Sequence, residues 1–527
     1  MIRRLTEPPL HRLSYCLGAL LLTTLATAAP LSKFQFEGNT VFTTAELDSL
    51  VANYVGRELT REDLEDARRV VTLHYVKAGY LNSGAILLDA EPVNGVVRLR
   101  IVEGRLTSIN LTGNHWLRSS YITNRIALCD GPPLNVNRLK DGLQLLRQDP
   151  NIEQINAELR PGMTPGESVL DLKVKDQQPF RVGLQVDNAR PPSVDSGELL
   201  LLLADRNLTG HGDALEGSYG IAEGGTTGFK FSDWNNIGGS YVVPVTVWDT
   251  TVRAYGDRKN YTVVEDPFNS LNINSESYRY GGLVRQPLYR TPNQEFAVAV
   301  AFERRHSYSE LLGQPFDFPE SGSVSGRTDI SVLRLSQEWV DRSQQQVLAL
   351  RSTFNIGLDV FGTTNDGTDR NGNFVTWLGQ GQYVRRLFNT QNQLVLRLDG
   401  QWTGNELVSL EQFAIGGINS VRGYRENQLV RDRGVFGSVE LRLPVLLNKL
   451  GAPMVQLAPF FDVGSGQNLG AEGQTETIFS AGIGLLVTPC RRVNAVLYWG
   501  YAFKDFKTTE DDPQDLGFDF RVTIDAF

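Results

Sequence analysis

From Phe180 to its end, the chain consists of segments of about ten residues in which apolar and polar side chains alternate, separated by polar loops. In the clearest segment, one side carries Leu348, Leu350 and Phe354, and the other carries Arg351, Thr353 and Asn355. A soluble sandwich would also alternate, but its apolar faces would meet in a core. Here the polar faces carry charges in strand after strand. The pattern therefore predicts a closed β-barrel with lipid outside and water inside.

Alternation predicts about sixteen strands, an even number as in bacterial outer-membrane barrels. They are expected to begin near residues 180, 197, 213, 238, 248, 276, 294, 328, 345, 373, 393, 434, 454, 477, 492 and 516. Short connections such as 290–293, 341–344 and 389–392 alternate with long ones such as 258–274, 307–327 and 405–433. Short turns on one side and long loops on the other are typical of such barrels.

The first 29 residues resemble a secretory signal peptide. Arg3, Arg4 and Arg12 form a basic start, Leu17–Leu25 is a short apolar run, and Ala26–Ala29 supplies small residues for cleavage. No later segment has the roughly 18 apolar residues that a membrane-spanning helix needs. A chain exported in this way can span a membrane only as a closed barrel.

Between the signal peptide and the barrel, the sequence contains a tandem repeat, predicted as one domain at 30–105 and another at 106–179. Phe34–Asn39 matches Ile109–Asn114, and Leu64 matches Leu139, each with an offset of 75 residues. Each copy is expected to have the order β-α-α-β-β.

In the first copy, a helix is expected around residues 44–54, and a second one follows Thr60, which would cap it with Asp63 three residues on. The apolar side of this second helix carries Leu64, Ala67, Val70, Val71, His74 and Tyr75. Strands at 85–89 and 96–102 would then be joined by a turn at Asn94-Gly95. We expect His74 to be a packing residue.

The composition gives little support for an enzyme or a nucleic-acid-binding protein. The net charge is −9, which disfavours a basic nucleic-acid face. The five histidines are scattered, and no catalytic triad or metal-ligand spacing is present, so no catalytic residue, metal or cofactor is predicted. Cys129 and Cys490 lie far apart in the sequence, and a disulfide is not required.

Two motifs carry a resemblance to a known family. The loop 405–433 contains Phe413-Ala414-Ile415-Gly416-Gly417 and then Val421-Arg422-Gly423-Tyr424-Arg425-Glu426, and a later strand contains Phe460-Phe461-Asp462-Val463-Gly464. With two preceding repeats, these motifs resemble the two-partner secretion transporters, the TpsB (ShlB/FhaC/HecB-like) family, over essentially the whole mature chain. The repeats resemble that family's POTRA domains.

The resemblance implies that the loop folds into the barrel and that Arg422 pairs with Asp462 on the inner wall. Its glycines, Gly416, Gly417 and Gly423, would let the backbone bend and approach the wall. Asp462 shares one strand face with Phe460 and Gly464, and this face lies in the lumen if Phe461 faces lipid. A guanidinium that forks onto one carboxylate would fix the position of the loop.

The resemblance further implies a monomeric translocator in the outer membrane, surrounded by lipid, with its POTRA domains in the periplasm. It would export, or export and activate, an unfolded partner exoprotein with an N-terminal secretion domain, without ATP. The client could add a strand to a POTRA edge, near Ile86, Leu87 and Leu88, although ordinary core packing explains these residues equally well. Two alternatives stay open, an outer-membrane assembly factor of the same superfamily and a non-specific porin.

Two features depart from the family pattern. Many members have an N-terminal plug helix, but here the first repeat is expected to begin near Lys33, just after the cleavage site, which leaves no room for one. The inward loop is then expected to be the main obstruction in the barrel. Phe527 is also out of phase with the alternating Phe518, Phe520, Val522 and Ile524.

Overall fold

The computed structural model describes residues 30–526 except 223–235, 266–267, 319–320, 366, 389, 471–472 and 509–511. The expected signal peptide, the question of a plug helix and Phe527 therefore lie outside the described residues. Among the helices that are described, none combines the length and the apolar character needed to cross a membrane. The chain divides into two compact units, one formed by residues up to 105 with 132–134 and 161–167, and one formed by the rest.

The first unit contains the first repeat, and its order of elements confirms the prediction. The elements are β1 (Lys33–Glu37), α1 (Thr44–Val51), a 3-10 turn (Ala52–Tyr54), α2 (Arg61–Lys77), β2 (Gly84–Leu87) and β3 (Val96–Val102). The sheet has the order β1-β3-β2, with β1 parallel and β2 antiparallel to β3. Both outer strands of this sheet are thus edges.

Helix α2 forms as its sequence predicts. Thr60 caps it, and Asp63 returns a hydrogen bond to the backbone of Thr60. The apolar face is buried in the core of the repeat through Leu64, Ala67, Val71 and Tyr75. His74 lies beside the ring of Phe42, 4.4 Å between ring centres, as a packing residue would.

The second repeat has the same architecture as the first. Its elements are β4 (Arg105–Thr112), α3 (Ser119–Ala127), α4 (Val136–Arg147), β5 (Ile152–Pro161) and β6 (Glu167–Asp176), and its sheet has the order β4-β6-β5. Gly38 and Gly113 both have a φ of +86°, and Thr60 and Asn135 both cap the second helix. The 75-residue repeat in the sequence is therefore also a repeat in structure.

A carboxylate holds the turn after the first strand in each repeat. Glu103 accepts hydrogen bonds from the backbone N–H groups of Thr40 and Val41 at 2.7 and 3.0 Å. Asp176 accepts three, from residues 115–117, at 2.6 to 2.8 Å. Glu103 and Asp176 are 73 residues apart, whereas the sequence repeat has an offset of 75. Aligning the two copies at that offset therefore does not match these two acids.

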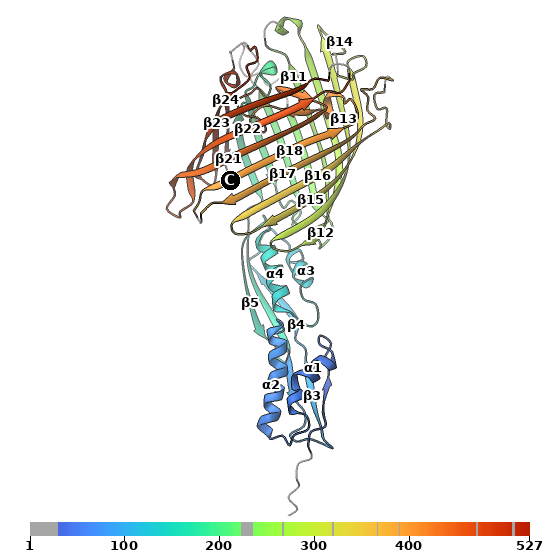
Figure 1. The fold of residues 1–527 in the computed structure, drawn as a ribbon, viewed down its shortest axis with the longest axis vertical. Coiled ribbons are helices and arrows are strands. Elements are labelled where there is room, and N and C mark those ends of the chain that lie inside the picture. The colour runs from blue at the N-terminus through green and yellow to red at the C-terminus, as the bar shows by residue number, and fades with distance from the viewer. Residues whose placement is uncertain are drawn as a thin grey trace, which may run out of the picture. The chain divides into compact units, whose positions relative to one another are not determined.

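The described residues from Phe180 onward form a closed antiparallel barrel (Figure 1). The barrel has 16 strands and closes where β25 pairs with β7. The strands are β7 (Phe180–Asp187), β8 (Glu198–Asp205), β9 (Ala214–Ala222), β10 (Asn236–Pro244), β11 (Thr251–Thr262), β12 (Asn274–Arg290), β13 (Gln294–Leu311), β15 (Arg327–Arg342), β16 (Gln346–Leu358), β17 (Val375–Arg386), β18 (Gln393–Thr403), β21 (Arg433–Leu447), β22 (Pro453–Gln467), β23 (Thr475–Cys490), β24 (Val493–Ala502) and β25 (Phe518–Asp525). A two-residue strand, β14 (Gln314–Pro315), pairs with the end of β13. The predicted fold class is confirmed.

Side-chain exposure follows the predicted alternation. On β16, Leu350 and Phe354 are 46% and 40% exposed, whereas Thr353 and Asn355 are buried. The buried polar groups pair across the sheet, since Asn355 donates to Thr376 at 2.8 Å and Thr353 shares a hydrogen bond with Ser336 at 3.0 Å. The apolar side therefore faces outward, where lipid surrounds a barrel of this kind, and the polar side faces the lumen.

The strands on one side of the barrel are longer than predicted. β12 and β13 have 17 and 18 residues, so the loops expected at 258–274 and 307–327 shrink to 263–273 and 312–326. The extra pairs are polar, such as the ion pair between Arg258 and Glu276 and the contact between Ser275 and Ser309. Polar cross-strand pairs suit a hairpin that continues beyond the lipid, and alternation in apolar residues does not detect them.

Within the second unit, the helices of the second repeat contact the short turns of the barrel. Arg125 forms an ion pair with Asp249 at 2.6 Å, in the turn between β10 and β11. Gln148 donates to the carbonyl of Pro292 at 2.8 Å, in the turn between β12 and β13. Arg118 donates to the carbonyl of Thr209 at 3.0 Å. These contacts mark the short-turn end of the barrel as the end nearest the repeat.

Candidate functional site

The connection from β18 to β21, residues 404–432, lies inside the barrel. It contains a small hairpin of β19 (Phe413–Ile415) and β20 (Leu429–Arg431), which the sequence did not predict. Its tip carries residues 421–424. The apolar side chains that hold it against the wall are Ile415, Val421, Tyr424, Leu429, Phe436 and Ile478. We call residues 404–432 the inward loop.

Arg422 joins the tip of the inward loop to the wall. Its Nε and Nη2 donate to the two oxygens of Asp462 at 2.8 and 2.9 Å, and its backbone N–H donates to the same carboxylate at 3.1 Å. Nη1 forms an ion pair with Glu440, and Nη2 donates to Ser438 at 3.0 Å. Arg422 is 5% exposed and Asp462 is fully buried. The structure thus brings the expected pair together and adds a second carboxylate.

Two aromatic rings enclose the guanidinium. Its carbon lies 3.7 Å from the ring centre of Phe460 and 4.6 Å from that of Tyr498, so cation–π attraction adds to the ion pairs. Two glycines leave space for these rings, because a Cβ at Gly482 would lie 2.5 Å from the Phe460 ring and one at Gly484 would lie 2.4 Å from Tyr498. The position of Arg422 is therefore defined from all sides.

The motif glycines allow backbone to approach backbone. Gly416, Gly417 and Gly423 have φ values of +119°, +89° and +84°, which favour glycine. A Cβ at Gly423 would lie 2.6 Å from the carbonyl oxygen of Gly500 in the wall, and one at Gly464 would lie 2.4 Å from a side chain of the inward loop. Substitution at these positions would force the loop away from the wall.

Tyr424 links the same tip to the next strands of the wall. Its hydroxyl donates to the carbonyl oxygen of Phe479 at 2.8 Å and accepts from the backbone N–H of Lys504 at 3.0 Å. Its ring packs against Phe506, 5.9 Å between centres. Val421, just before Arg422, is fully buried. All four residues 421–424 thus touch the wall.

A second anchor holds the inward loop to a different part of the wall. Glu411 accepts from Arg334 at 2.8 and 3.1 Å and from Arg305 at 2.8 Å. Arg334 also forms an ion pair with Glu303 at 2.9 Å. Glu303 in turn accepts a hydrogen bond from the Tyr255 hydroxyl at 2.8 Å. The Glu411 side chain is 4% exposed. Sequence reasoning missed this anchor, because Glu411 stands outside the motifs and its partners lie on strands far away in sequence.

Further ion pairs fix the two sides of the loop. Arg425 pairs with Asp515 and, at 2.7 Å, with Glu265, both of which belong to other connections of the barrel. Asp432 accepts from the backbone N–H of Leu407 at 3.0 Å and pairs with Arg370 at 3.4 Å. Arg425 directly follows the Arg-Gly-Tyr motif, but nothing in the sequence indicates its partners.

The residues proposed for client contact lie on or just after the edge strand β2 in the first repeat. Ile86 is 42% exposed, while Leu87 is partly buried against the core and Leu88 donates its N–H to the carbonyl of Arg98. Part of the edge is already covered, because the N–H of Ala85 donates to Thr72 on α2 at 3.1 Å. The backbone edge that remains for a client strand is centred on Leu87.

Comparison with models of known protein families identifies the family of this chain. A family model described as haemolysin secretion/activation protein ShlB/FhaC/HecB matches residues 166–487, more than half of the chain. The chain belongs to this family. A second model, described as POTRA domain, ShlB-type, matches residues 29–104, which include the first repeat.

Relatives are similar over most of the chain. The outer membrane transporter CdiB of Dickeya dadantii (strain 3937) is 25% identical over 79% of this chain and 74% of its own. The heme/hemopexin transporter protein HuxB of Haemophilus influenzae (strain 86-028NP) is 24% identical over 83% of this chain and 76% of its own. The solved structure of CdiB from Escherichia coli has the same fold, with a TM-score of 0.72, 20% identity and coverage of 97% and 92%. This protein is therefore an outer-membrane transporter of two-partner secretion, with periplasmic POTRA repeats.

Proposed function

We propose that this transporter recognises an unfolded partner exoprotein, through the N-terminal secretion domain of that partner, and passes it through the barrel. Transporters of this class act on a partner exoprotein, and the names of the relatives agree with that role. The observation that carries the proposal is Arg422, held by Asp462 and Glu440 in the lumen. A loop held in this way gives an aqueous path with a fixed internal constriction.

The first POTRA repeat supplies the recognition edge in this proposal. An extended client segment would add to β2 beside Leu87, with Ile86 offering exposed apolar surface next to it. We place the domain boundaries at 30–105, 106–179 and 180–527, with residues 1–29 removed as a signal peptide. The transporter acts as a monomer in lipid, and folding of the client outside the cell drives export without ATP.

The alternatives receive less support from the same observations. An assembly factor of the same superfamily would share the barrel and the POTRA fold, but the family match over 166–487 is to secretion/activation proteins. A non-specific porin would not need two POTRA repeats in front of the barrel.

Deletion of residues 32–105 tests the proposal. Export should be lost while the barrel still inserts, because the recognition edge is removed and the membrane fold is retained. Culture medium is assayed for the exported partner, and membranes are assayed for heat-modifiable barrel. Normal export by the deletion variant would remove the first repeat from the mechanism.

Two point variants sharpen this test. Leu87→Pro removes a backbone N–H at the proposed edge, and Ile86→Asp places a charge on its exposed face. Each should lower export strongly. Val93→Asp is the matched control, because Val93 is 60% exposed in the same repeat but lies outside β2. Equal export by Ile86→Asp and Val93→Asp would place recognition elsewhere.

A further inference from the structure

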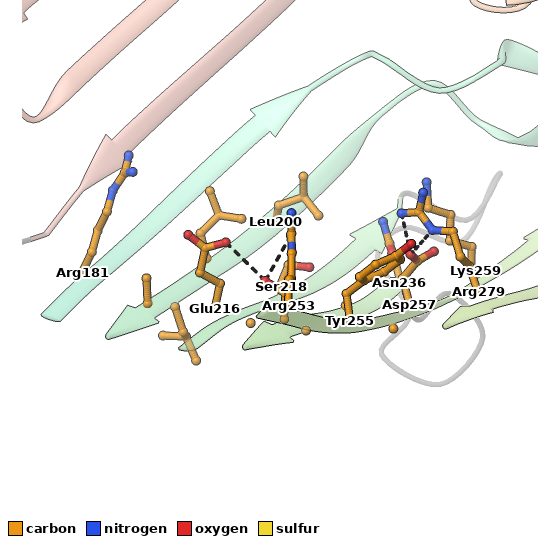
Figure 2. Close-up of a pocket in the computed structure, with 18 of the residues that line it drawn as sticks. Arg181, Leu200, Glu216, Ser218, Asn236, Arg253, Tyr255, Asp257, Lys259 and Arg279 are labelled. Carbon is orange, nitrogen blue, oxygen red and sulfur yellow. Dashed lines mark hydrogen bonds and ion pairs between the residues drawn. The ribbon is translucent and has the colours of Figure 1, made fainter. Parts of the chain in front are cut away.

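One part of the lumen wall is strongly basic and contains none of the residues that anchor the inward loop, although its Lys259 also borders Glu198 and the loop residue Glu426. It forms a recess of about 490 Å³ over strands β7–β12. Figure 2 shows Arg181 at one end, Arg253 in the middle, and Arg279 and Lys259 at the other end. Arg206 also lines it. We call these five residues the basic row.

The cations of the basic row face the lumen. On β11, Val252 lies on the apolar outer side and is 40% exposed, so Arg253 lies on the opposite side. On β12, Tyr280 is 58% exposed on the outer side, so Arg279 faces inward. The side chains of Arg181 and Arg279 are 39% and 46% exposed, so they remain hydrated and available to a ligand.

Positive charge in the recess exceeds negative charge. The lining residues include two carboxylates, Glu216 and Asp257, and the latter pairs with Arg279 at 2.6 Å. Arg181 pairs with Asp525 at 2.8 Å, outside the recess. Three cations have no carboxylate partner among the described residues, namely Arg206, Arg253 and Lys259. Within the described part of the chain, the hydrogen-bond acceptor of the Arg253 side chain is a serine hydroxyl, Ser240, at 3.1 Å.

The anchoring charges of the inward loop are engaged elsewhere on the wall. Arg422 is buried against Asp462 and Glu440, and Glu411 is held by the arginines of β13 and β15. The recess therefore keeps its excess of positive charge in a chain whose net charge is −9.

The recess also has an apolar floor, and it lies where a polypeptide that passes through the barrel could contact it. Leu200 and Leu202 line it from β8, whose two faces are both apolar. Arg206 lies at the short-turn end, beside the turn in which Thr209 accepts from Arg118 of the second repeat. The row then crosses the strands obliquely and reaches the long-loop end, where β11 carries Lys259. It thus extends from the end at which a client would enter toward the end at which it would leave.

We propose that the basic row is a guide for the exported polypeptide and binds extended segments rich in Asp and Glu. This inference rests on the transport function and names the chemistry of the cargo. Guanidinium groups form charge-assisted hydrogen bonds to carboxylates, and rings or rows of Arg and Lys select anions in pores. Because the row is hydrated, each contact is weak and sensitive to salt, which suits a cargo that must move on.

The test measures binding of a labelled octaglutamate peptide to the full-length transporter in detergent by fluorescence anisotropy. Octaglutamate should bind at low salt, and its affinity should fall as the salt concentration rises. Labelled octalysine should bind with much lower affinity. The double variant Arg253→Glu with Lys259→Glu should weaken octaglutamate binding about tenfold or more, since two attractive charges become repulsive. Heat-modifiability establishes that this variant is folded.

Arg386→Glu is the matched control, because Arg386 is exposed at the end of β17, on the strand face that carries Gln380, and lines neither the recess nor the cavity next to it. It should change octaglutamate binding by less than about twofold, since it borders no cation of the basic row. Equal weakening by Arg386→Glu, or no binding of octaglutamate to the native protein, would overturn the inference. Because the assay contains no client, export of the partner by the same variants tests the proposed function separately.

Discussion

At Arg422, one positive charge compensates two buried carboxylates, so the substitutions around it should not be equivalent. Loss of Arg422 leaves Asp462 without a cation, whereas Glu440 keeps Arg442 at 2.7 Å. Loss of Asp462 leaves Arg422 with Glu440 and with two aromatic faces. Breaking a buried pair by removing one partner costs about 3–5 kcal/mol, because a charge remains without compensation. Loss of Arg422, which removes the only cation beside Asp462, should therefore destabilise the site more than loss of Asp462.

Arg422→Ala should therefore reduce export more than Asp462→Ala, and both variants should still insert. In the double variant, export should be no worse than in Arg422→Ala, because the second change removes the carboxylate that the first left without a cation. Export of the partner and heat-modifiability of the barrel are measured together. Arg351→Ala, at an exposed lumen pair of 3.7 Å, is the control. Additive losses in the double variant would mean that the two residues act separately.

At the scale of elements, the alternation of apolar residues predicted each barrel strand with its start within three residues of the observed one. This succeeds because lipid on one side and water on the other impose a period of two on every strand. The contact between Arg422 and Asp462 came from the family motif. Glu440 and Glu411 could not be paired with their arginines, because the register between distant strands and the path of the loop are set by closure of the whole barrel.

The carboxylate that holds the turn in the first repeat makes a prediction about pH. Burial alone would raise the pKa of Glu103, but hydrogen bonds from Thr40, Val41 and Tyr75 outweigh it and hold the pKa below its ordinary value. The folded state therefore gains stability from this group above the unfolded pKa of about 4.3, and this gain is lost as the pH falls through the lower folded pKa.

Glu103→Gln should destabilise the first repeat at neutral pH by roughly 2 kcal/mol, the value of hydrogen bonds to a charged group. Its stability should also change less than that of the native protein between about pH 5 and pH 3. Hydrogen–deuterium exchange of residues 38–47 in the full-length transporter, compared at equal pH, measures both effects. Glu65→Gln, which removes an exposed carboxylate of α2, should have little effect. If residues 38–47 of Glu103→Gln were as strongly protected from exchange as those of the native protein, the turn would not depend on this acid.

At the scale of the molecule, the barrel and the inward loop together set the size of the water-filled path. The loop is held on one wall by Arg422 and on another by Glu411, so neither anchor alone defines its position. In the absence of cargo, ionic conductance should therefore depend on how many anchors are intact.

Purified protein should require detergent, shift on gels after heating and conduct ions in planar bilayers. Glu411→Gln or Arg422→Ala should raise the mean conductance moderately, and the double variant should raise it more than the sum, because the loop has then lost its two main buried anchors. Arg351→Ala should leave it unchanged. Equal conductance in the double variant and the native protein would show that the loop is not the constriction.

The positions of the loop anchors along the chain have a consequence for biogenesis. Arg305 and Arg334 precede the inward loop, whereas Asp462 and Asp515 follow it. The loop can reach its final place only when strands from both ends of the barrel sequence are present, and such long-range contacts form late. Docking of the loop therefore coincides with completion of the cylinder. A barrel truncated before its last strand would carry a loop that never fully docks.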